Sequence, residues 1–164
     1  MMDLPIRRAA IVGTAPSWMQ TPWSDPGLYI AGLNDGYMCR DAYGRGPQRA
    51  SEWWELHPLD QMYFRAANST IVMADQIPPG HYVRPAGHLE WLKAQAKTIP
   101  VWLQADPPPG WPPLARRLNV EDLEAQYGTY WASGPAYMLL SLLSRGCEEL
   151  HVYGIHLSTE HEYR

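Results

Sequence analysis

The sequence has little cysteine and almost no phenylalanine, with two residues of the first kind and one of the second among 164. Cys39 and Cys147 lie far apart and form no CxxC pair, which argues against a secreted scaffold built on disulfides. A chain of this length buries a core without such crosslinks. We therefore expect a protein of a reducing, cytoplasmic compartment.

An excess of positive charge and long apolar runs are also missing. The formal net charge is −4, so no basic face is expected for nucleic acid or for an anionic membrane surface. The first apolar run stops at Thr14 and Pro16, and it is too short for a signal peptide or a membrane span. The expected partner is a small ligand, and self-association into a homo-oligomer is left open.

Tryptophan, tyrosine and proline are abundant, with 8, 10 and 16 residues. So much proline favours rigid turns over long helices, and the segment ADPPPGWPPLARR (105–117) is predicted to be an extended surface loop. Most tryptophans are expected in the core. Trp18, Trp23 and Trp111 are candidates to stack on a base or sugar from a loop.

Short apolar runs alternate with segments of helical spacing, which predicts βαβ units and a parallel sheet. We expect one Rossmann-like α/β domain over residues 1–164, with a mostly parallel sheet flanked by helices and ligands bound beyond the carboxyl ends of the strands. The predicted strands are 9–13, 28–33, 52–56, 71–74, 99–103 (an edge strand, given Pro100) and 149–155, and the predicted helices are 59–67, 88–97 and 133–145.

Glycine and hydroxyl residues follow the first predicted strand. Gly13 would let the backbone approach a phosphate, and Thr14 and Ser17 supply hydroxyl groups. The motif is neither GxGxxG nor a P-loop with its lysine, so a plain strand-to-helix turn explains it equally well.

Two further turns are candidates for ligand contact. Asn34 and Asp35 follow the second predicted strand, where an amide and a carboxylate would face a ribose or a base edge, although Asn-Asp-Gly is also common turn chemistry. Ser133 and Gly134 begin a predicted helix, whose N-terminus favours an anion. Simple helix capping is the alternative there.

Histidines supply the candidate acid–base groups. His57 directly follows the third predicted strand and would act as a general acid or base at the ligand end of the sheet, with a capping or core-edge role as the alternative. The C-terminal histidines and glutamates lack HExxH spacing, so no metal site is expected.

Three segments in this order resemble the sialyltransferases of glycosyltransferase family 42 and a related domain shared with hydroxymethylpterin pyrophosphokinases. They are IVGTAPS, the position of Asn34, and ASGPAYMLLSLLSRGCEELHVYGIHL. The resemblance covers the two ends of the chain well and its middle poorly. The chain also resembles small phage-encoded proteins, from which no activity carries over.

In the sialyltransferases the matching loops hold the cytidine monophosphate part of the donor. The resemblance implies displacement at a sugar carbon without a metal or other cofactor. It implies binding roles for Gly13, Thr14, Ser17, Asn34, Ser133, Gly134 and Gly154.

The chain also departs from that family. His156 stands where the family usually has an acidic residue, and Tyr163 is a loose counterpart of two tyrosines that assist the leaving phosphate. The family's general-base histidine lies further downstream, beyond Arg164, so either the chain is truncated or only a nucleotide pocket is retained. Two functions follow: a glycosyltransferase-like enzyme that binds a nucleotide or nucleotide-sugar donor, or a non-catalytic phage accessory protein that sequesters a nucleotide. An assembly protein is the third alternative.

Overall fold

Six parallel strands form one sheet at the centre of the molecule. The computed structural model describes residues 6–57, 59, 64–65, 84–129 and 133–155. In spatial order the strands are β7 (Ala115–Arg117), β6 (Val101–Leu103), β3 (Glu52–Glu55), β2 (Tyr29–Leu33), β1 (Arg8–Val12) and β8 (Glu149–Tyr153). The chain moves outward from β1 in one direction and returns to β8 on the other side of β1. This is the single α/β domain with a parallel sheet that the sequence predicted.

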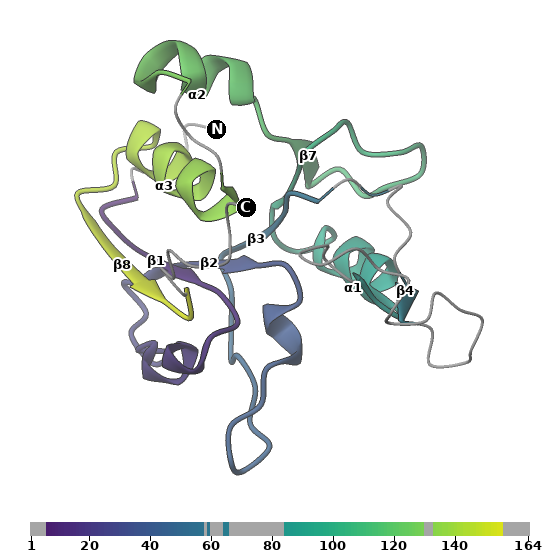
Figure 1. The fold of residues 1–164 in the computed structure, drawn as a ribbon, viewed down its shortest axis with the longest axis vertical. Coiled ribbons are helices and arrows are strands. Elements are labelled where there is room, and N and C mark those ends of the chain that lie inside the picture. Colours follow the sequence, from purple (N-terminus) through teal and green to yellow (C-terminus); the bar gives the residue numbers. More distant parts are fainter. Residues whose placement is uncertain (1–5, 58, 60–63, 66–83, 130–132, 156–164) are drawn as a thin grey trace, which may run out of the picture.

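Helices cover both faces of the sheet (Figure 1). The helices α2 (Val120–Tyr127) and α3 (Gly134–Ser144) lie over one face, and α1 (His88–Gln95) lies over the other together with the 3-10 turn η1 (Pro16–Gln20). A second 3-10 turn, η2 (Gly36–Met38), follows β2, and β4 (Phe64–Arg65) pairs with β5 (Arg84–Pro85) in a separate two-stranded sheet. None of the helices in the described part of the chain is long and apolar enough to cross a membrane.

Successive side chains of a strand point to opposite faces of the sheet, so the apolar side chains pack against both helical layers. Ile11 and Trp54 pack in the cluster under α2 and α3, whereas Val12 packs with η1 and Trp53 packs with α1. Strand β3 is buried at all four positions, because it lies in the middle of the sheet with a helical layer on each side. Both of its glutamates are therefore fully enclosed.

Several local predictions are wrong. Strand β6 is not an edge strand: Pro100 precedes its first paired residue, so the missing N–H breaks no ladder bond, and β7 pairs beyond it. The edge is formed by Ala115–Arg117, the end of the segment predicted to be a loop. Trp18 packs in the core at 5% exposure and is not a stacking platform.

Of the three predicted helices, the first is contradicted and the other two are confirmed. Phe64–Arg65 is a strand, contrary to the helix predicted for 59–67, and the strand predicted for 71–74 lies outside the described residues. The helices predicted at 88–97 and 133–145 are confirmed as α1 and α3.

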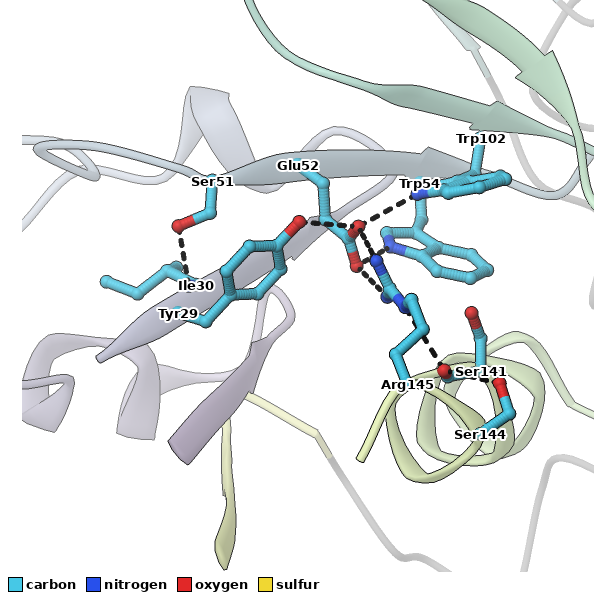
Figure 2. A network of polar contacts seen from close by, with 9 residues as sticks. All are labelled: Tyr29, Ile30, Ser51, Glu52, Trp54, Trp102, Ser141, Ser144 and Arg145. Carbon is cyan, nitrogen blue, oxygen red and sulfur yellow. Dashed lines mark hydrogen bonds and ion pairs between the residues drawn. The ribbon is translucent and has the colours of Figure 1, made fainter. Parts of the chain in front are cut away.

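A buried ion pair fastens α3 to the sheet at the amino end of β3 (Figure 2). Arg145, at the end of α3, donates from both terminal guanidinium nitrogens to Glu52, at 2.7 and 2.8 Å. The same carboxylate accepts hydrogen bonds from Tyr29 Oη and from the indole nitrogens of Trp54 and Trp102. Five donors thus compensate one carboxylate with no exposed surface.

Neutralising this carboxylate is expected to destabilise the fold. In Glu52→Gln the guanidinium of Arg145 loses its counter-charge while it stays largely enclosed, which typically costs about 3–5 kcal/mol. The measurement is the free energy of unfolding from denaturant titration. Glu148→Gln is the matched control, since Glu148 is exposed. A loss no larger than that of the control would contradict this account of the ion pair.

Candidate functional site

The turns after β1 and β8 lie against each other, backbone to backbone. A Cβ on Gly13 would sit 2.5 Å from the carbonyl oxygen of Gly154, and one on Gly154 would sit 2.6 Å from the carbonyl oxygen of Gly13. The backbone N–H of Ala15 donates to that same Gly154 carbonyl at 2.8 Å. Close packing therefore accounts for the absence of a side chain at both glycines.

The first loop, which follows β1, carries two hydroxyl residues, Thr14 and Ser17, and their surroundings differ. Ser17 Oγ accepts a hydrogen bond from the backbone N–H of Gly154 at 2.8 Å, so it pins the first loop to the last. Thr14 is exposed, and its backbone carbonyl accepts a weak bond from Cys39 Sγ. A void beside Gly13 and Trp53 measures about 10 Å³, which is room for no more than one water molecule. Of the three predicted residues, Thr14 is the one turned toward solvent.

Asn34 has the most distinctive environment of the predicted binding residues. Its φ of 49° lies in the left-handed region, which asparagine tolerates better than most residues. Its backbone carbonyl accepts the indole N–H of Trp53 at 2.8 Å. Its side-chain Oδ1 is buried and has no hydrogen-bond partner within the described residues. A buried carbonyl oxygen without a hydrogen-bond donor lowers the stability of the fold by about 1–3 kcal/mol. An N–H or O–H group of a ligand would remove this cost by donating to Oδ1.

Asp35 precedes η2 without capping it through its side chain. It lies close enough to raise the pKa of two neighbours, although burial is the larger cause for both: the phenol of Tyr37 and the thiol of Cys39. Asp35 thus contributes negative charge beside Asn34.

The amino end of α3 reaches the carboxyl ends of β2 and β3. A Cβ on Gly134 would lie 3.6 Å from Leu56 Cδ1 and 3.8 Å from Leu33 Cδ1. These leucines immediately precede His57 and Asn34 in the chain. Ser133 occupies the N-cap position with extended backbone, but its side chain makes no capping bond, contrary to the simple capping alternative. Gly134, Asn34 and His57 therefore gather at one edge of the sheet, as predicted.

A buried carboxylate stands between two histidines at this edge. Glu55, the last residue of β3, is fully enclosed. Its Oε1 accepts from the backbone N–H of His57 at 3.0 Å and lies 2.8 Å from His57 Nδ1. Its Oε2 lies 2.6 Å from Nε2 of His88, the first residue of α1, which is also fully buried. The carboxylate thus orients both rings, and the side chain of His57 keeps 34% of its surface exposed.

Aromatic rings support the inner histidine. Tyr37 lies parallel to His88, with its hydroxyl 3.2 Å from His88 Nδ1. Trp91 also stacks on Tyr37, with ring centroids 3.9 Å apart. This packing fixes the ring of His88 and, through Glu55, the orientation of His57.

The charge of Glu55 depends on these partners. Burial alone would raise the pKa of its carboxyl, but the hydrogen bonds and positive charge of His57 and His88 lower that pKa to about 2. Glu55 therefore stays ionised. A carboxylate–histidine pair of this kind suits proton transfer, because the carboxylate holds the imidazole ring in one orientation.

Sequence reasoning placed His57 at this edge but missed Glu55, His88 and Tyr37. Glu55 was detectable, because a carboxylate within the apolar run EWWEL must be paired if the run is a central strand. His88 and Tyr37 were not, because only the docking of α1 brings His88 to Glu55, 33 positions earlier in the chain, and to Tyr37.

The remaining predicted residues, His156 and Tyr163, lie outside the described residues. Within the described ranges no group of three or more histidines, cysteines or carboxylates is placed to hold a metal ion. His57 and His88 each direct one ring nitrogen at an oxygen of Glu55, so these nitrogens are engaged by the carboxylate.

Comparisons of the chain with protein-family models, with curated proteins and with solved structures found no match.

The ionisation of Glu55 predicts how stability changes with acid. Its carboxyl has a pKa near 4.5 when unfolded and about 2 when folded, so the unfolded state binds the proton first as the pH falls. The resulting stabilisation, about 3 kcal/mol, is complete above pH 4.5 and is lost between that pH and 2. Denaturant titrations at pH 5.5 and 2.5 should therefore show a smaller difference in Glu55→Gln than in the unsubstituted protein. Glu148→Gln should keep the full difference, and equal differences in all three proteins would refute the assignment.

Proposed function

We propose that the carboxyl edge of the sheet binds a nucleotide or nucleotide-sugar donor and that His57 acts there as a general base in glycosyl transfer. The observation that carries the proposal is the Glu55–His57 pair, a buried carboxylate that orients a partly exposed imidazole at this edge. Parallel α/β domains bind their ligands at the carboxyl ends of the strands. The resemblance to family 42 sialyltransferases points to the same edge and to the same donor class.

Asn34 and the amino end of α3 provide the binding half. The unpartnered Oδ1 of Asn34 would accept a hydrogen bond from an amino or hydroxyl group of the nucleoside. The helix N-terminus at Gly134 would favour the phosphate, because the helix dipole is positive there. Ser133 adds a hydroxyl that is not engaged in capping.

The chemical step would be a displacement at the sugar carbon, in which an acceptor hydroxyl replaces the nucleotide. His57, oriented by Glu55 through Nδ1, takes a proton from the acceptor hydroxyl. The acceptor oxygen bonds to the sugar carbon as the bond from that carbon to the phosphate oxygen breaks, and the nucleotide leaves with the electron pair. Glu55 stabilises the imidazolium that forms.

Nucleotide binding is expected to depend on Asn34. Calorimetric titration with cytidine and uridine mono- and diphosphates should show binding that weakens about tenfold in Asn34→Ala, because one buried hydrogen bond is lost. Gln126→Ala, which removes an exposed amide on α2, is the matched control and should bind normally. No binding of any of these nucleotides to the unsubstituted protein would overturn the proposal.

Turnover separates the enzyme from the non-catalytic alternative. Release of nucleotide from a cytidine- or uridine-linked sugar should fall about a hundredfold or more in His57→Ala, the usual contribution of a general base. His151→Ala is the control, since His151 lies on β8 and pairs with Glu149. Nucleotide binding without detectable turnover would instead support the sequestering protein.

A further inference from the structure

A cleft of about 700 Å³ lies at the opposite, amino edge of the sheet. Its wall is formed by residues just before or at the start of the strands, among them Arg8, Tyr29, Ser51 and Leu114. The volume falls in the range of small-molecule binding sites. The cleft is separate from Asn34 and His57, which follow the carboxyl ends of β2 and β3.

Arginine dominates the charge of this cleft. Five of the 13 lysines and arginines of the chain line it, whereas no aspartate or glutamate among the described residues does so. Such a concentration in a chain of net charge −4 raises the local potential for anions. The five are Arg7, Arg8, Arg49, Arg116 and Arg145.

Two of these guanidinium groups are paired with carboxylates. Arg145 is bound by Glu52, and Arg8 lies 3.0 Å from Asp25 and 3.4 Å from Glu149. Their positive charge is therefore largely compensated within the protein.

The other three form no ion pair with a residue that the structure describes, although Arg49 lies near enough to the carboxylate of Asp25 to lower the pKa of that group. Arg49 donates to the backbone carbonyls of Trp23, Asp25 and Leu28, which are neutral groups that fix its position. Arg7 and Arg116 are exposed and form no ion pair with any residue that the structure describes. The positive charges of Arg7 and Arg116 repel each other and that of Arg49, and a bound anion would reduce that repulsion.

Aromatic rings hold part of the arginine cluster in place. The guanidinium carbons of Arg116 and Arg145 lie 6.0 and 5.7 Å from the ring centroid of Trp102. The indole N–H of Trp102 donates a hydrogen bond to Glu52. Figure 2 shows Arg145 reaching from α3 to Glu52 between Tyr29 and Trp102. The wall of the cleft is thus a packed polar network with fixed orientation.

We propose that this amino-edge cleft binds a small, multiply charged oxyanion, held by Arg7 and Arg116 with Arg49 as a fixed third charge. A planar guanidinium group donates in parallel to two oxygens of a phosphate or a carboxylate, so both classes share the recognition chemistry. The site goes beyond the proposed function, because it needs neither Asn34 nor His57.

The test is a calorimetric titration of the full chain with two probes, sodium tripolyphosphate and sodium citrate, at low and at high salt. The unsubstituted protein should bind at least one probe, and the preferred probe shows whether phosphates or carboxylates fit. Affinity should fall as the ionic strength rises, because the arginines are exposed to screening. Failure to bind either probe at low salt would overturn the proposal.

Variants then locate the site. Arg7→Gln/Arg116→Gln should raise the Kd about tenfold or more, whereas Lys93→Gln/Lys97→Gln removes the same charge from exposed positions near α1 and should change it little. Equal losses in both pairs would mean that net charge alone attracts the probe, and the site would be rejected. Asn34→Ala should leave probe binding intact, and a loss there would move the binding to the carboxyl edge. Circular dichroism of each variant checks that it is folded.

Discussion

Two fully buried carboxylates on one four-residue strand organise this molecule. Glu52 and Glu55 begin and end β3, and both are enclosed. A buried carboxylate is stable only when hydrogen-bond donors or positive charges surround it. Each of the two therefore contacts partners from distant parts of the chain. Glu52 gathers Arg145 from α3, and Glu55 gathers His88 from α1. The helical layers on the two faces of the sheet are thus attached to the same short strand through charge.

The same arrangement gives the two edges of the sheet different chemistry. At the carboxyl edge a carboxylate faces the imidazole rings of His57 and His88. At the amino edge a carboxylate faces a guanidinium group, which keeps its charge over the ordinary pH range. Burial would lower the pKa of Arg145, but the hydrogen bonds and charge of Glu52 raise it. One buried carboxylate is therefore paired with imidazoles and the other with a guanidinium group.

The sequence predicted what depends on local pattern. Short apolar runs located β1, β2, β3, β6 and β8, apolar spacing located α1, and the start and stop residues Ser133, Pro135 and Gly146 located α3. It failed where neighbours in space decide the outcome: Pro100 reads as an edge signal, yet β7 pairs outside β6 because the proline lies before the first ladder position. The position of His57 at the ligand edge was predictable from the strand that precedes it. Its pairing with Glu55 and the hidden role of His88 depend on how α1 docks, which no local pattern encodes.

The contact between Gly13 and Gly154 has a consequence for how the chain acquires its structure. The first loop is shaped by a turn that lies about 140 positions later, through Ser17 and the backbone of Ala15. During synthesis from the N-terminus, β1 and its loop emerge long before β8 exists to complete them. The first loop therefore reaches its final conformation among the last parts of the molecule. Contacts of such long range also favour slow folding, because the intervening chain must be ordered before they form.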